Sequence, residues 1–99
     1  MKNTEVRQSP IQGKGLFSCR SFLTGEIVEE IDGEIVLRDS KSKYAIPMSG
    51  GRTMILCNKV KFVNHSTNPN VTFNLKRWAL IAIRDISKGE ELTSFYANF

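Results

Sequence analysis

The segment 62–70 is rich in amide and hydroxyl side chains and opens with two apolar residues. Residues 68–70 read Asn-Pro-Asn and predict a turn, because proline fixes φ and asparagine tolerates unusual backbone conformations. Asn64 and His65 come shortly before this turn, so we expect them on a loop rather than on a helix. Polar side chains crowded between apolar strands usually satisfy buried backbone groups or contact a ligand. This loop is therefore the first candidate for a binding site.

Three further blocks carry the same kind of information. Residues 79–86 predict a strand that ends in a charged turn, and residues 87–96 read Ser-Lys-Gly-Glu-Glu-Leu-Thr-Ser-Phe-Tyr. Earlier in the chain, residues 11–17 read Ile-Gln-Gly-Lys-Gly-Leu-Phe, and residues 25–28 read Gly-Glu-Ile-Val. Glycine permits positive φ and a close approach of backbone to ligand, although two glycines by themselves also suit an ordinary hairpin turn.

Taken in order, these blocks resemble those of the SET-domain protein-lysine methyltransferases. The resemblance runs from about Ser9 to Tyr96, nearly the whole chain, and it makes residues 1–99 a single SET domain. Each block alone is weak, whereas four in the right order are strong. The resemblance implies an enzyme that takes a methyl group from S-adenosylmethionine, releases S-adenosylhomocysteine and methylates a lysine on a basic protein segment such as a histone tail.

The resemblance also assigns residues to the cofactor. The backbone of the Gly-x-Gly segment would pass along the cofactor. Asn64 is similar to the family asparagine that hydrogen-bonds the cofactor's amino-acid end, and His65 to the neighbour that holds the adenine through its backbone. A lone histidine is also typical of a structural hydrogen-bonding residue. The expected cofactor-binding residues are Lys14, Gly15, Leu16, Phe17, Asn64 and His65.

Tyr96 is the expected catalytic residue, because it ends the pattern Gly-Glu-Glu-Leu-Thr-x-x-Tyr of the family. Its hydroxyl would orient the substrate amine and contact the transferring methyl group. The expected lining of the substrate channel is Tyr44, Phe62, Ser94, Phe95 and Phe99. Tyr44 suits packing on a sheet equally well. Ser94 is small but can hold a water molecule, so the number of methyl groups transferred stays open.

The residue types suit methyl transfer better than hydrolysis. A lysine must be neutral to attack, and deprotonating it at pH 7 costs roughly 4–5 kcal/mol, which a desolvated channel reduces. Such a site needs a narrow apolar tunnel, a few fixed oxygens and alignment, and it needs no strong base. The chain has one His, no Ser-His-Asp order and no Gly-x-x-x-x-Gly-Lys phosphate loop.

Short β-branched segments between turn signals predict a mainly β protein. No stretch has sustained helical periodicity, and no internal repeat is visible. The expected longer strands are 27–31, 34–37, 53–57, 71–75, 78–83 and 91–96. The resemblance refines this fold class to the SET β-clip: short strands in small sheets, with a knot-like C-terminal segment that threads beneath a loop near the Asn-His block. Such threading is an exception to the rule that chains do not pass through loops.

The composition allows one small domain with a modest core, since the chain has 99 residues of which 40% are hydrophobic. Cys19, Cys57 and the single His lie far apart and make a poor zinc set, so no metal site is expected. There is no run long enough to span a bilayer and no cationic-then-apolar leader. We therefore expect a soluble intracellular protein without a membrane partner; cytoplasm, nucleus, nucleoid and a secreted effector remain open.

The net charge of +4 is segregated along the chain. Acidic residues gather between 26 and 34, and most of the later charges are basic. Two solvated faces explain this pattern, and so does an acidic strip that meets a cationic peptide. Direct nucleic-acid binding is disfavoured, because the basic residues are scattered and are not interleaved with aromatic residues.

The chain departs from the family at its C-terminus, where it ends three residues after Tyr96. Many relatives add a cysteine-rich tail that closes the lysine channel. Phe99, or a second copy of the chain in a homodimer, would have to supply the missing wall. A catalytically weak, SET-like protein-binding module is therefore the alternative function.

Overall fold

The computed structural model describes residues 2–37 and 44–95. These ranges form strands and two short 3-10 helices, η1 (Ser49–Gly51) and η2 (Lys59–Phe62), and they contain no α-helix. The strands are β1 (Thr4–Gln8), β2 (Lys14–Ser18), β3 (Ile27–Glu30), β4 (Gly33–Val36), β5 (Ala45–Pro47), β6 (Thr53–Leu56), β7 (Asn64–His65), β8 (Val71–Asn74), β9 (Ala79–Ala82) and β10 (Glu91–Ser94). The predicted mainly β fold class is confirmed. No helix in the two ranges is long and apolar enough to cross a membrane.

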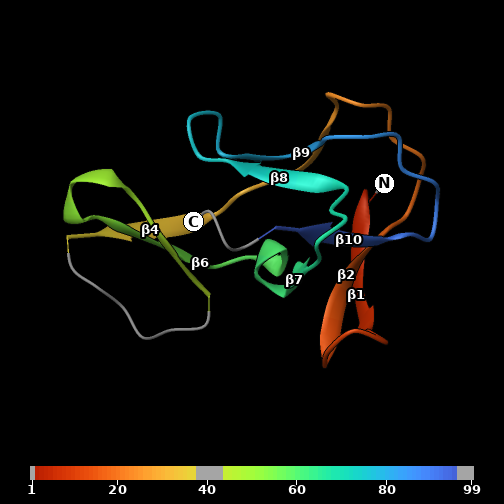
Figure 1. Ribbon diagram of the computed structural model, residues 1–99, viewed down its shortest axis with the longest axis horizontal. Coiled ribbons are helices and arrows are strands. Elements are labelled where there is room, and N and C mark those ends of the chain that lie inside the picture. The colour runs from red at the N-terminus through yellow and green to blue at the C-terminus, as the bar shows by residue number, and fades with distance from the viewer. Residues whose placement is uncertain (1, 38–43, 96–99) are drawn as a thin grey trace.

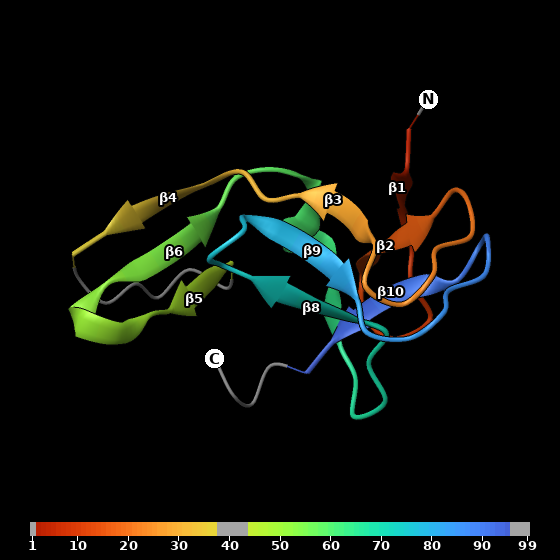
Figure 2. The ribbon, with the colours of Figure 1, turned by 90° about the horizontal axis from the view of Figure 1, so that it is seen from above.

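The strands form three small sheets with the orders β1-β2-β10-β7, β3-β9-β8 and β4-β6-β5. Figure 1 shows the β4-β6-β5 sheet at one end of the molecule and the β1–β2 hairpin at the other. Seen from above, the β3-β9-β8 sheet lies between these two ends (Figure 2). The first sheet joins the two ends of the chain, because β10 pairs antiparallel with β2 and parallel with β7.

Strand β10 is held on its second side by the loop that follows β7. Asn70 is almost completely buried. Its side-chain oxygen accepts the Thr93 N–H at 2.8 Å, and its side-chain nitrogen donates to the Glu91 carbonyl at 2.9 Å. The Ser66 N–H donates to the Ser94 carbonyl at 3.0 Å. The last described strand therefore lies between β2 and this loop, as the predicted threading requires.

One hydrophobic core draws side chains from all three sheets. Leu16 on β2 and Leu92 on β10 are register partners and are fully buried. Leu80 on β9 and Met54 on β6 belong to the same buried cluster. Each fully buried side chain of this size contributes about 1.5–3 kcal/mol, so these contacts fix the three sheets against one another.

Two predicted segments differ from the structure. The expected strand 34–37 begins one residue earlier, at Gly33, and it does not pair with the preceding strand, because β3 and β4 belong to different sheets. The predicted strand 78–83 begins one residue later, because Trp78 has a left-handed φ of 51° and belongs to the turn. The Asn74 side-chain oxygen fixes that turn by accepting the N–H groups of Lys76 and Arg77, each at 3.1 Å.

Gly15 lies on β2, where a side chain would collide with β10. A Cβ atom at Gly15 would overlap the Glu91 carboxylate oxygen Oε2 and would lie 3.1 Å from Ser9 Cβ. The Glu91 carboxylate accepts the Ser9 hydroxyl at 2.8–2.9 Å. The role of glycine here is therefore to leave room for a carboxylate rather than to allow positive φ.

We expect Gly15→Ala to lower the free energy of unfolding by about 1–3 kcal/mol, because the displaced carboxylate loses its hydrogen bonds. Urea unfolding followed by circular dichroism measures the change. In a Glu91→Ala background the same substitution should cost less than half as much, since nothing then occupies the space. Equal costs in the two backgrounds would contradict this explanation.

Candidate functional site

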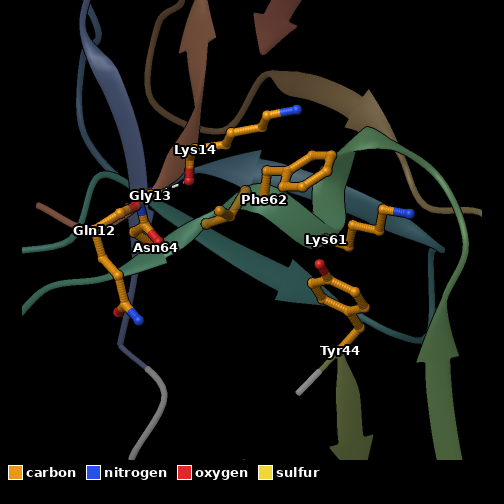
Figure 3. Close-up of a pocket in the computed structure, with 8 residues that line it drawn as sticks. Gln12, Gly13, Lys14, Tyr44, Lys61, Phe62 and Asn64 are labelled. Atoms are coloured by element: carbon orange, nitrogen blue, oxygen red, sulfur yellow. Dashed lines mark hydrogen bonds between the residues drawn. The ribbon is translucent and has the colours of Figure 1, made fainter. Parts of the chain in front are cut away.

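A pocket of about 550 Å³ opens beside the start of β2 and the end of η2 (Figure 3). Three separate parts of the chain line it: residues 12–14, Tyr44 and residues 61–64. Among residues 2–37 and 44–95, the lining is Gln12, Gly13, Lys14, Tyr44, Lys61, Phe62, Val63 and Asn64. Sequence analysis selected Lys14, Tyr44, Phe62 and Asn64 for cofactor and channel roles, and the structure brings these four together. Their individual roles remain predictions.

Aromatic rings and a cation form one wall of the pocket. The rings of Tyr44 and Phe62 meet edge to face, with their centroids 6.2 Å apart and an interplanar angle of 74°. The Lys61 Nζ atom lies 5.2 Å from the Tyr44 centroid and 5.4 Å from the Phe62 centroid. This is within the range of cation–π attraction. Sequence reasoning missed Lys61 as a site residue; its position next to Phe62 was the available signal.

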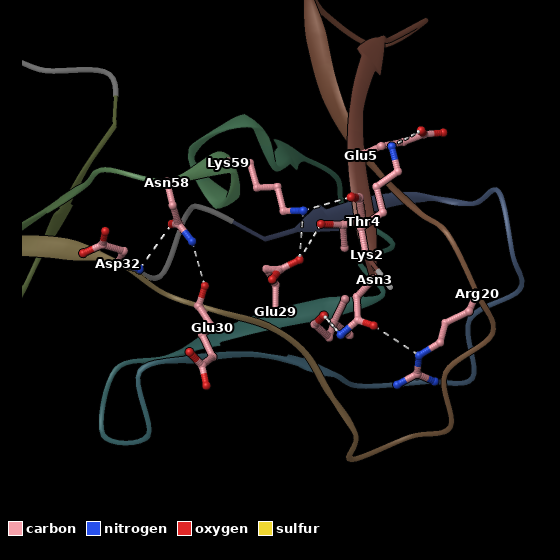
Figure 4. Close-up of polar contacts among 11 residues, drawn as sticks. Lys2, Asn3, Thr4, Glu5, Arg20, Glu29, Glu30, Asp32, Asn58 and Lys59 are labelled. Carbon is pink, nitrogen blue, oxygen red and sulfur yellow. Dashed lines mark hydrogen bonds and ion pairs between the residues drawn. The ribbon is translucent and has the colours of Figure 1, made fainter.

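Contacts at the start of η2 position this wall (Figure 4). The Lys59 Nζ atom donates to the Thr4 carbonyl at 2.9 Å and lies 3.4 Å from the Glu29 carboxylate. The Asn58 side chain donates to the Glu30 carbonyl at 2.8 Å. These bonds attach the helix to β1 and β3, and thereby hold the pocket residues that follow it.

The Asn64 side chain connects the pocket to the Gly-x-Gly segment. Its amide nitrogen lies 3.2 Å from the carbonyls of Gln12 and Lys14 and 3.2 Å from the Ser9 hydroxyl. The same nitrogen lies 2.9 Å from Oε2 of Glu91. An amide NH₂ group has two hydrogens, so these acceptors share them. The sequence analysis did not select Ser9 or Gln12, because neither residue type by itself indicates a site.

The rest of the predicted cofactor segment does not line this pocket. Gly15 and Leu16 are buried inside the sheet, and Phe17 is partly buried. The Arg7 guanidinium carbon lies 4.3 Å from the centre of the Phe17 ring. Two of these residues thus have packing partners of their own, Gly15 with Glu91 and Phe17 with Arg7, and any contact to a cofactor would come from their backbone.

Of the remaining predicted residues, the described ones belong to β7 (His65), to β10 (Ser94) and to the position after β10 (Phe95). His65 is exposed, and its ring centroid lies 5.2 Å from that of Phe95. Ser94 is buried and is the register partner of His65. Tyr96 and Phe99, the expected catalytic residue and channel wall, lie outside the described residues. Their roles stay predictions from the sequence pattern.

Among the described residues that line the pocket, the charged ones are Lys14 and Lys61. The pKa of Asp85 is lowered by the Thr24 backbone N–H and then by the Thr24 hydroxyl, which donate to its carboxylate at 2.9 and 3.0 Å. Asp85 does not line the pocket, so this pair fixes a turn. In the ranges 2–37 and 44–95, no three His, Cys, Asp or Glu side chains lie close enough together to hold a metal ion.

This arrangement suits an elongated ligand with two different ends. An amide and two ammonium groups favour a polar end that contains an anion, and the two aromatic rings favour a flat or cationic portion. The volume lies within the usual range for small-molecule sites, roughly 300–1,000 Å³. The part of the pocket wall that the described residues form has no Ser-His-Asp arrangement and no carboxylate.

Comparisons with known proteins agree with the fold. Human histone-lysine N-methyltransferase 2B is 32% identical over 112 residues, which cover 92% of this chain and 4% of the human protein. Trithorax of Drosophila virilis is 30% identical over 112 residues, with 92% of this chain and 3% of the relative covered. The chain therefore spans only a small part of these relatives. A humanized mutant of Chaetomium thermophilum Polycomb Repressive Complex 2 superposes with a TM-score of 0.77 at 23% identity, covering 98% of this chain and 15% of the other, which supports the fold alone.

A protein family also matches most of the chain. The SET domain family matches residues 13–97, which include both the Gly-x-Gly segment and the block that ends at Tyr96. The chain therefore belongs to the SET-domain family.

Proposed function

We propose that this chain is a protein-lysine N-methyltransferase that uses S-adenosylmethionine and acts on a basic protein segment such as a histone tail. The observation that carries the proposal is that the Gly-x-Gly segment, Tyr44 and residues 61–64 line one pocket together. Two of these three parts belong to sequence blocks that define the resemblance to the family. The related proteins named above are histone-lysine N-methyltransferases, which supports the substrate class. A histone-like substrate would place the activity in the nucleus or nucleoid.

The pocket residues fit the two ends of S-adenosylmethionine. Its carboxylate would face the ammonium groups of Lys61 and Lys14, and its α-ammonium group would face the side-chain oxygen of Asn64. The rings of Tyr44 and Phe62 would pack against its apolar and sulfonium portions. All of these groups line the same pocket. Charge-assisted hydrogen bonds of this kind are about twice as strong as neutral ones.

When bound, S-adenosylmethionine supplies a methyl group on a sulfonium that leaves as a neutral thioether. The substrate amine forms its N–C bond as the C–S bond breaks, and the extra proton on nitrogen passes to water. The chain has to align that amine and keep it neutral. The aromatic wall would exclude water, and the positive charge of Lys61 beside it would disfavour a second cation, so both would lower the pKa of an incoming lysine. The Tyr96 hydroxyl would orient the amine.

The acidic strip divides into two groups in the structure. Glu26 lies 3.7 Å from Arg20, and Glu29 contacts Lys59, so these two carboxylates have partners within the chain. Glu30, Asp32 and Glu34 are exposed. The three exposed carboxylates would attract a cationic substrate segment. A homodimer that closes the channel remains a proposal from the sequence.

We expect Tyr96→Phe to abolish methyl transfer while leaving the affinity for S-adenosylhomocysteine within about twofold, because only the hydroxyl that orients the amine is lost. Transfer of a radiolabelled methyl group to core histones and other basic proteins measures activity, and calorimetry measures affinity. Unchanged activity in the variant would remove Tyr96 from the catalytic role. Cofactor binding by the wild type without any labelled product would favour the protein-binding module.

Lys61→Met keeps the length of the side chain and removes its charge. We expect it to weaken S-adenosylhomocysteine about tenfold, because a hydrogen bond to a charged group contributes about 1.5–3 kcal/mol, part of which solvent exposure removes. Lys88→Met, at an exposed turn that does not line the pocket, is the matched control and should leave affinity unchanged. If both variants bind equally well, the carboxylate does not face Lys61.

A further inference from the structure

We propose that Glu91 is a positioning residue, which lies behind the pocket and fixes the Asn64 amide so that it accepts a hydrogen bond from the α-ammonium group of the cofactor. This inference rests on the proposed function. Glu91 does not line the pocket. Its carboxylate reaches the site only through Asn64, whose side-chain nitrogen lies 2.9 Å from Oε2.

The first step concerns the orientation of the amide. Each of the four partners of the Asn64 nitrogen can accept a hydrogen bond: two backbone carbonyls, the Ser9 hydroxyl and the Glu91 carboxylate. If the amide were turned over, its oxygen would face two carbonyl oxygens and a carboxylate, which donate nothing. The nitrogen therefore faces the Gly-x-Gly segment, as Figure 3 shows for the Lys14 carbonyl, and the amide oxygen faces away from it.

The second step concerns charge. Glu91 is the only charged group among the four acceptors and makes the shortest of the four contacts. Within the described residues Glu91 forms no ion pair, whereas its neighbour Glu90 lies 3.2 Å from Arg84. A hydrogen bond donated to an anion polarises the amide and increases the negative charge on its oxygen. The ligand group that Asn64 favours is therefore a cationic donor.

The third step concerns how Glu91 itself is held. The Ser9 hydroxyl donates to both carboxylate oxygens, at 2.9 and 2.8 Å. The missing side chain of Gly15 leaves the space that the carboxylate occupies. The next residue, Leu92, is fully buried against Leu16. Glu91 is thus fixed by three neighbours and can impose its orientation on Asn64.

The test compares two ligands that differ in one group. Calorimetry gives the affinities of S-adenosylhomocysteine and of its analogue that lacks the α-amino group. We expect the wild type to prefer the amino compound by tenfold or more, a difference of about 1.4 kcal/mol. Glu91→Gln should reduce this preference to about two- or threefold, while affinity for the analogue without the amino group stays within twofold, because only the polarised acceptor is weakened.

Two further variants separate positioning from folding. Glu90→Gln removes a carboxylate one residue away and should keep the full preference. Asn64→Ala should remove the preference, and Glu91→Gln in that background should change it no further, because Glu91 acts only through Asn64. Thermal unfolding checks that each variant is folded. If Glu91→Gln does not fold, Glu91→Asp keeps the charge but withdraws it by one methylene, and it should lose part of the preference.

The outcomes distinguish this inference from the proposed function. If the wild type binds neither ligand at millimolar concentration, both fail. If the wild type prefers the amino compound and Glu91→Gln keeps that preference in full, the role of Glu91 is wrong and the proposed function is untouched. A further loss from Glu91→Gln in the Asn64→Ala background would also overturn the inference.

Discussion

The side-chain amide of Asn64 is the contact on which the site depends. It joins segments that lie far apart in the sequence, since its nitrogen bonds to Gln12 and Lys14 at one end of the chain and to Glu91 at the other. Buried or half-buried polar groups that lose a partner cost about 1–3 kcal/mol each, so these segments stay together. This one side chain therefore holds the pocket wall and the Gly-x-Gly segment in place relative to each other.

A second asparagine, six residues later in the chain, also joins distant segments through its side-chain amide. Asn70 connects the loop after β7 to the backbone of β10 through its side-chain oxygen and nitrogen. Both amides hold β10 beside the short strand β7, Asn70 through the backbone of β10 and Asn64 through the Glu91 side chain. The loop 62–70 was selected from its sequence as a ligand loop, and the structure shows that it also satisfies buried backbone groups. The two readings of such a loop are therefore compatible.

Much of the fold and part of the site were predictable from local signals. Turn residues, β-branched segments and the ordered motifs gave the strands, the family and Asn64. The pairing of β3 and β4 with different sheets was not predictable, because alternation along a strand does not identify its partner. Lys61, Ser9 and Glu91 were not selected, since their roles come from contacts between residues 27 to 82 positions apart or from a single turn of 3-10 helix. The hydrophobic periodicity of a sequence does not indicate such contacts.

The position of β10 between β2 and β7 has a consequence for how the chain folds. Ser9 and Glu91 are separated by 82 positions, and the strands that flank β10 come from the first fifth of the chain and from its middle. Closing such long loops costs conformational entropy before any contact repays it, so folding should be slow for a domain of this size. The hydrogen bond between Asn64, which lines the pocket, and Glu91 can form only after the last strand has been inserted. A molecule that binds the pocket of the folded chain, and has no affinity for partly folded chains, would therefore stabilise the completed fold.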